Sequence, residues 1–105
     1  MKDPSECESM AEVRLCVDAL DEEIVTLLGK RMRFMEAAAR IKTDRDQVRD
    51  EQRKAEVIAH AQARAVLVGF PPLLVGELYE RLVEASIAHE LNCFDERARI
   101  PTVGS

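Results

Sequence analysis

The chain contains little that would interrupt a helix. Its 105 residues include no Trp, only four Gly and four Pro, and 4% aromatic residues. Ala, Leu, Val, Glu and Arg dominate instead, and this composition favours helix over strand. At this length we expect one domain with an all-α fold.

Three further absences limit the class of function. The net charge of −5 is the opposite of the cationic surplus that nucleic-acid binding requires, so we expect no nucleic-acid partner. No run approaches the ~18 apolar residues of a membrane span. The first residues hold no apolar core typical of a signal peptide. We therefore expect a cytoplasmic protein with no membrane association.

Cysteine and histidine are also scarce. Cys7, Cys16 and Cys93 are odd in number and widely spaced, and the chain has two histidines. No pair has metal-ligand spacing, so we expect free thiols in a reducing compartment and no bound metal.

Apolar residues that recur every three or four positions predict a long first helix. It begins after Ser9, which forms a capping box with Glu12, and it runs to about Lys42. A helix of ~30 residues is far longer than the globular mean of ~11–12. It cannot fold back on itself, so other helices or a second subunit must cover its apolar stripe. This feature predicts a homodimer.

Two shorter helices follow a polar loop at residues 43–49. Asp50 is expected to cap the second helix, which ends before Gly69. Pro72 fits the first turn of a third helix that continues to about Arg97. The sequence thus predicts a lead-in at residues 1–8, a helical domain at 9–97 and a tail at 98–105. We interpret Arg97, like most arginines outside the set below, as a solvated or ion-paired side chain.

Polar and charged residues recur at intervals among the apolar positions of these helices. Seven of them form the candidate site: Arg14, Arg31, Lys42, Asp50, Arg53, Ser86 and Glu90. One face of the first helix carries four residues at i, i+4, i+7 and i+11: Arg31, Met35, Ala38 and Lys42. These four lie within about 40° of one helix face, and the two cations are about 16 Å apart along the axis. A row of side chains that project little from the helix, with a cation at each end, suits the binding of a small molecule with more than one anionic group.

Three other members of the set are placed by helix geometry. Arg14 is ~25 Å from Arg31 and ~260° round the helix, so it could serve this pocket only on an antiparallel partner. Val83, Ser86 and Glu90 share one face of the third helix at i, i+3 and i+7.

Short segments in this order and spacing resemble the all-helical (AroQ-type, class II) chorismate mutases, a family that includes the related isochorismate pyruvate lyases. The resemblance covers about residues 9–95. The segments are Glu12-Val13-Arg14, Asp18-Ala19-Leu20-Asp21, Leu28-Gly29-Lys30-Arg31, Lys42, Val48-Arg49-Asp50-Glu51-Gln52-Arg53 and Ser86-Ile87-Ala88-His89-Glu90.

The resemblance implies an intertwined, domain-swapped homodimer and a cofactor-free isomerase that converts chorismate to prephenate. It places the enzyme in the shikimate pathway, and its product would serve aromatic amino-acid biosynthesis or a secondary metabolite. Arg14 would reach the substrate from the second subunit, Arg31 and Arg53 would hold carboxylates, and Asp50 and Ser86 would contact the substrate. The catalytic residues would be Arg31, Lys42 and Glu90, with the last two at the ether oxygen. The pocket wall would be Met35, Ala38 and Val83.

Glu90 departs from the Gln that is common in the family at this position. Gln always has an N–H to donate, whereas Glu donates only when it is protonated. Burial favours the neutral carboxyl, and the surrounding cations favour the carboxylate. We expect activity to depend on protonated Glu90 and to decline as pH rises.

Lys54 is a second departure, because several mutases carry a glutamate there for the ring hydroxyl. Together with the stretch around residues 3–7, it keeps an isochorismate pyruvate lyase of salicylate and siderophore synthesis open, whereas Asp50 favours the mutase. A mutase acting on 4-amino-4-deoxychorismate is a third possible function, after the chorismate mutase and the lyase. A noncatalytic regulatory helical dimer is a fourth. The intact cationic set argues against the last.

Overall fold

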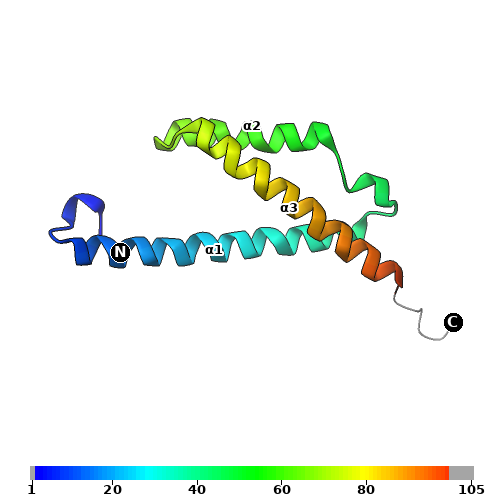
Figure 1. The fold of residues 1–105 in the computed structure, drawn as a ribbon, viewed down its shortest axis with the longest axis horizontal. Coiled ribbons are helices and arrows are strands. Elements are labelled where there is room, and N and C mark those ends of the chain that lie inside the picture. Colours follow the sequence, from blue (N-terminus) through cyan, green and yellow to red (C-terminus); the bar gives the residue numbers. More distant parts are fainter. Residues whose placement is uncertain (1, 100–105) are drawn as a thin grey trace. The chain divides into compact units, whose positions relative to one another are not determined.

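The computed structural model describes residues 2–99 and shows an all-α fold, as predicted (Figure 1). Of the predicted tail at 98–105, residues 100–105 lie outside the described part. No strand occurs in residues 2–99, and none of their helices combines the length and apolar character that a membrane crossing requires. The elements are η1 (Pro4–Glu6), α1 (Met10–Ile41), η2 (Arg45–Gln47), α2 (Glu51–Val68) and α3 (Pro72–Arg99), where η denotes a short 3-10 turn.

The start of α1 follows its predicted cap with one difference. The Ser9 hydroxyl oxygen accepts a hydrogen bond from the Glu12 N–H at 3.2 Å. The Glu12 carboxylate accepts from the N–H of Glu8 at 2.9 Å instead of that of Ser9, and it also pairs with Lys2 at 3.0 Å. Amides at a helix start lack intrahelical acceptors, so these contacts hold the lead-in against the first turn.

The predicted start and end of α2 and the predicted start of α3 are confirmed, whereas α3 continues to Arg99, two residues into the predicted tail. The Asp50 carboxylate accepts from the Arg53 N–H at 3.0 Å and caps α2. Gly69 ends α2 with a left-handed φ of 74°, a conformation that a Cβ would strain. Pro72 is the first residue of α3.

The chain divides within α1 into two compact units, which are described separately. The first ends at Arg33 and contains η1 and the larger part of α1. The second begins at Phe34 and contains the last turns of α1, then η2, α2 and α3. In the second unit α2 packs against α3 around a small core of Val48, Val83 and Ile87, with Val57, Tyr79 and Leu91 against it. Val48 lies in the segment that the sequence predicts as a polar loop, yet only 4% of its surface is exposed.

Side chains of α3 hold the segment that leaves α1. Arg45 of η2 pairs with Asp95 at 2.9 Å. Arg97 donates to the carbonyl oxygen of Lys42 at 2.9 Å and also to that of Arg40. The last carbonyls of a helix lack intrahelical donors, so Arg97 caps the end of α1. Its interpretation as a solvated or ion-paired surface side chain missed this role.

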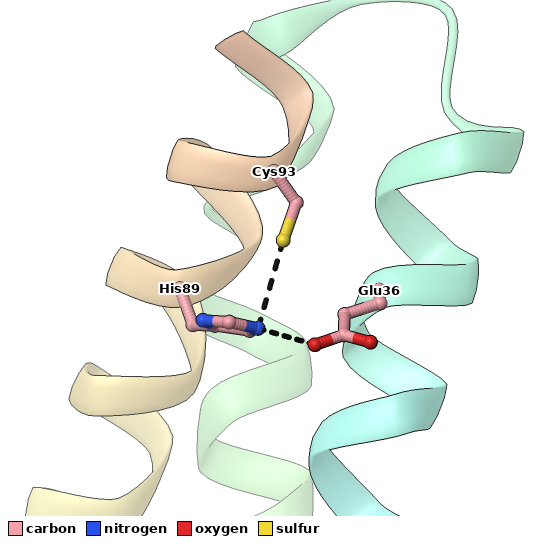
Figure 2. A group of neighbouring side chains, drawn as sticks. All are labelled: Glu36, His89 and Cys93. Atoms are coloured by element: carbon pink, nitrogen blue, oxygen red, sulfur yellow. Dashed lines mark hydrogen bonds and ion pairs between the residues drawn. The ribbon is translucent and has the colours of Figure 1, made fainter. Parts of the chain in front are cut away.

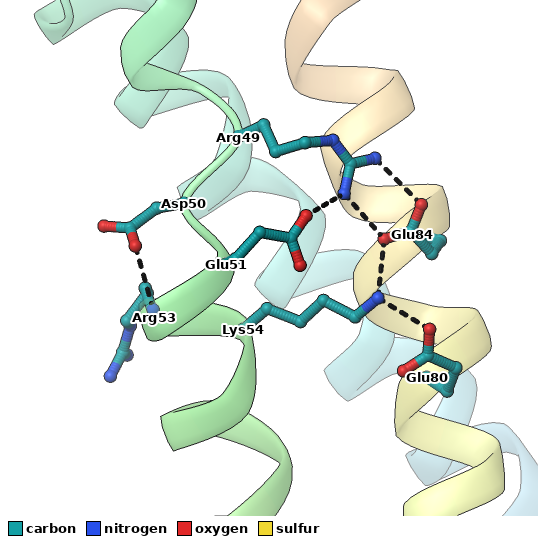
Figure 3. A network of polar contacts seen from close by, with 7 residues as sticks. All are labelled: Arg49, Asp50, Glu51, Arg53, Lys54, Glu80 and Glu84. Atoms are coloured by element: carbon teal, nitrogen blue, oxygen red, sulfur yellow. Dashed lines mark hydrogen bonds and ion pairs between the residues drawn. The ribbon is translucent and has the colours of Figure 1, made fainter.

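A network of ion pairs joins the start of α2 to α3 (Figure 3). The Arg49 guanidinium donates to both oxygens of Glu84 at 2.9 and 3.1 Å and to Glu51 at 2.8 Å. Lys54 Nζ lies 2.6 Å from Glu80 and 2.9 Å from Glu84. Hydrogen bonds from Arg49 and then Lys54 lower the pKa of Glu84 from its ordinary 4.5 to about 2. The contact with Glu80, and then that with Glu84, raises the pKa of Lys54.

We predict that Glu84→Gln lowers the melting temperature near neutral pH. The pKa of Glu84 is lower in the folded chain, so its contribution to stability is present above pH 4.5 and is lost as the pH falls toward about 2. The difference in melting temperature between wild type and variant should therefore be largest at pH 7 and vanish near pH 2. Thermal unfolding followed by circular dichroism across this range measures it. Glu80→Gln, which removes one contact of Lys54 only, is the matched control with a smaller effect. A difference that does not change with pH would contradict this account.

Candidate active site

Two of the predicted site residues form an ion pair between the end of α1 and α3. Lys42 follows the last residue of α1, and its N–H still donates to the Ala38 carbonyl at 2.9 Å. Its Nζ lies 2.7 Å from Glu90 Oε2, although the two residues are 48 positions apart in the sequence. The Glu90 side chain is only 5% exposed and that of Lys42 is 28% exposed. A lysine and a buried carboxyl group thus meet, and their role at an ether oxygen, which the family resemblance implies, stays a prediction.

The α3 face that carries Glu90 points into the second unit. Val83, Ser86 and Glu90 are all buried, with 6%, 2% and 4% of their surfaces exposed. The Ser86 hydroxyl donates to the Leu82 carbonyl at 2.7 Å, a bond that serves the helix itself.

Small or flexible apolar side chains occupy the last turns of α1. Met35 and Ala38 are half-buried, and Ala39 is buried with 2% exposure. Met35 and Ala38 belong to the same unit as Lys42 and Glu90. Their role as a pocket wall stays a prediction.

Asp50 and Arg53 are not brought to the Lys42–Glu90 pair. Both are exposed at the start of α2, where Asp50 is the helix cap and the Arg53 guanidinium lies 3.7 Å from Glu56. Figure 3 shows both side chains pointing away from Glu84 and α3. Their contact with a substrate therefore stays a prediction.

Arg14 and Arg31 lie on the part of α1 that belongs to the first unit. Arg14 is exposed and Arg31 is half-buried. The substrate contacts expected of these two residues stay predictions.

The Lys42–Glu90 pair can direct two hydrogen-bond donors at one atom. An ammonium group has three N–H donors, and one of those of Lys42 is used by Glu90. The carboxyl group of Glu90 accepts through Oε2, so a proton on its second oxygen could be donated to a ligand. This arrangement suits the stabilisation of an oxygen atom that gains negative charge.

A second cluster beside this pair was missed by the sequence analysis. His89 has its Nε2 2.7 Å from Glu36 Oε2 and 3.6 Å from Cys93 Sγ (Figure 2). The i, i+4 spacing of His89 and Cys93 was a usable signal, because it places both on one helix face. Glu36 is 53 positions away from His89, and no local pattern connects them.

We predict that Lys42→Met lowers the free energy of unfolding by about 1–3 kcal/mol, because it leaves a buried group without its donor. Adding Glu90→Gln should recover most of this loss, since a neutral amide costs less to bury than a carboxylate. Urea denaturation of the single and double variants tests this. Lys30→Met, at an exposed lysine of α1, is the matched control and should change stability by less than about 0.5 kcal/mol. A double variant no more stable than Lys42→Met would contradict the prediction.

Comparison with known proteins agrees with the resemblance seen in the sequence. The family model described as "Chorismate mutase type II" matches residues 13–91. The chain is also 29% identical over 91 residues to the isochorismate pyruvate lyase of Pseudomonas aeruginosa, an alignment that covers 87% of this chain and 90% of that protein. Because the family match spans well over half of the chain, this protein belongs to the type II (AroQ) chorismate mutase family.

Proposed function

We propose that this protein is a chorismate mutase that rearranges chorismate to prephenate without a cofactor. The observation that carries the proposal is the ion pair of Lys42 and Glu90, whose Nζ and Oε2 atoms are 2.7 Å apart with the carboxyl group buried. Asp50, with Arg53 three positions after it in the sequence, also favours a mutase. The reaction is an intramolecular rearrangement, so it requires no nucleophile and no proton relay.

Two physical effects would supply the catalysis. Binding holds chorismate in its compact diaxial conformer, which is a positioning contribution. As the C–O bond breaks, negative charge grows on the ether oxygen, and donors directed at that oxygen stabilise the transition state more than the ground state. Loss of one such donor typically costs about 10²–10³ in rate. We assign these donors to Lys42 and to protonated Glu90, and the holding of carboxylates to Arg14, Arg31 and Arg53.

Protonation of Glu90 is compatible with its contact to Lys42. A carboxylic acid can accept from the Lys42 ammonium through one oxygen and donate the proton on the other to the substrate. An ionised Glu90 would instead face the developing negative charge and raise the barrier. Lys42 is the charged partner that the end of α1 presents to this carboxyl group. Because Glu90 can donate only while it carries a proton, the active form of the enzyme should be favoured by acid.

We further propose that the protein acts in the cytoplasm as an intertwined homodimer in which Arg14 is donated across subunits. In the single chain, apolar side chains along α1 are left exposed, including Leu20 at 44%, Ile24 at 52% and Leu27 at 61%. Exposed apolar residues in such a row are typical of a surface that another helix covers. A second copy with its α1 antiparallel would cover this row and bring Arg14 to the partner's site.

An isochorismate pyruvate lyase is the second candidate, favoured by the similarity to the Pseudomonas aeruginosa lyase. Its substrate shares two carboxylates and an ether oxygen with chorismate, so the same cations would bind it. The elimination of pyruvate is also pericyclic and also places charge on the ether oxygen. The electrostatic demands of the two reactions are therefore alike.

Product analysis distinguishes the two candidates. Purified protein is incubated separately with chorismate and with isochorismate at pH 5 and pH 8, and the products are identified by chromatography. We expect prephenate from chorismate, formed faster at pH 5 because Glu90 is then more often protonated. Salicylate and pyruvate from isochorismate, with only slow prephenate formation, would establish the lyase instead. A lack of turnover of either substrate would contradict both enzymes and leave a mutase acting on 4-amino-4-deoxychorismate or a noncatalytic regulatory dimer.

Glu90→Gln should make the rate independent of pH. An amide keeps an N–H donor at every pH, whereas the wild-type kcat should fall as Glu90 loses its proton. When kcat is measured from pH 5 to 9 with a chelator present, the kcat of the variant should equal or exceed that of the wild type at the alkaline end. Glu96→Gln, at an exposed glutamate of α3, is the control and should keep the wild-type profile. A wild-type rate that is level across this range would rule out the role of protonated Glu90.

A further inference from the structure

Glu36, His89 and Cys93 form a cluster of three different metal-ligand types outside the proposed substrate site (Figure 2). One ligand atom from each lies within 4.8 Å of the other two. His89 and Cys93 are one turn apart on α3, and Glu36 comes from the last turns of α1. All three belong to the second unit of the chain.

The distance between Cys93 and His89 fits a tetrahedral ion of the zinc class, and Glu36 needs only a small movement to join them. Zn–S bonds of about 2.3 Å and Zn–N bonds of about 2.0–2.1 Å, at the tetrahedral angle, place sulfur and nitrogen about 3.6 Å apart. The Cys93 Sγ to His89 Nε2 distance is 3.6 Å. The same geometry separates nitrogen and carboxylate oxygen by about 3.4 Å. His89 Nε2 and Glu36 Oε2 are 2.7 Å apart. For both atoms to bind the ion, the Glu36 carboxylate has to move away from His89 by less than the length of one of its own bonds.

We propose that Glu36, His89 and Cys93 bind a divalent ion of the zinc class and that this ion clamps the end of α1 to α3. Imidazole, thiolate and carboxylate are ligands that zinc accepts, whereas calcium and magnesium prefer oxygen alone. The ion binds neutral His89 through Nε2, so that the imidazole hydrogen lies on Nδ1, and it binds Glu36 as a carboxylate. Cys93 binds as a thiolate after it releases its thiol proton to solvent. Water occupies the fourth position.

The surroundings leave the cluster open to an ion. The His89 and Glu36 side chains are 35% and 34% exposed, which permits entry from solvent and leaves room for the fourth ligand. His89 directly precedes Glu90, and Glu36 lies six positions before Lys42 in the chain. An ion here therefore joins the two segments that carry the Lys42–Glu90 pair, and it stabilises the folded chain because it binds only that state.

The test is a titration of metal-free, full-length protein with Co²⁺. We expect one Co²⁺ per chain with a near-ultraviolet charge-transfer band from a cobalt–thiolate bond. Cys93→Ser should abolish the band. Changes in the outer shell of metal sites already cost about 10–100-fold in affinity, so His89→Ala and Glu36→Gln should each weaken binding by about 100-fold or more. Zn²⁺ should raise the melting temperature of the wild type but not that of Cys93→Ser.

Two matched variants control for thiols and imidazoles elsewhere. Cys16→Ser and His60→Ala should keep the band and the affinity of the wild type, and circular dichroism of every metal-free variant checks that it is folded. Several results would overturn the site: no band in the wild type, a full band in Cys93→Ser, or a band lost in Cys16→Ser. Wild-type affinity in Glu36→Gln would overturn the clamp between α1 and α3.

Discussion

The second unit of this protein depends on one costly contact, the buried Glu90 carboxyl group beside the Lys42 ammonium. Removing a charge from water costs several kcal/mol, and a pair of apolar side chains in the same place is often as stable or more stable. Packing alone therefore gives little reason to retain an ion pair here. The contact is instead consistent with the proposed role, in which Lys42 and protonated Glu90 donate hydrogen bonds to a substrate oxygen that gains negative charge.

The neighbours of this pair restrict where Lys42 can lie. Arg97 of α3 donates to the Lys42 carbonyl, so the backbone of the lysine is bound to the same helix as its side chain. Arg45 and Asp95 add a second tie between η2 and α3. Val48 is buried against Val83 and Ile87 and closes the loop onto the core. A donor held from both its backbone and its side chain loses less entropy when it binds a ligand, which is the physical meaning of preorganisation.

The parts of this molecule that could be predicted from sequence are those with local causes. The caps at Ser9 and Asp50 and the left-handed Gly69 depend on residues within one turn, and all three are confirmed. Val48 could not be placed, because its burial is decided by α3, more than thirty positions later. The contacts of Glu36 with His89 and of Arg97 with α1 are equally remote in sequence. The seven site residues were selected from their recurrence among apolar positions, and the family resemblance then implied a role for each. Of these, the structure pairs the side chains of Lys42 and Glu90, and Asp50 accepts from the Arg53 N–H as a helix cap.

Lys54 shows how the fold changes an argument made from sequence. Read alone, a lysine where several mutases carry a glutamate indicates a substrate with different polar groups. In the structure its amine lies between Glu80 and Glu84, and Arg49 and Glu51 complete the network. Two cations there face three carboxylates, so the positive charge of Lys54 is already compensated within the protein. A substrate group would have to displace a carboxylate to reach it. Lys54 thus has a sufficient structural reason to be a lysine, and its presence carries less weight for the lyase than the residue type alone suggests.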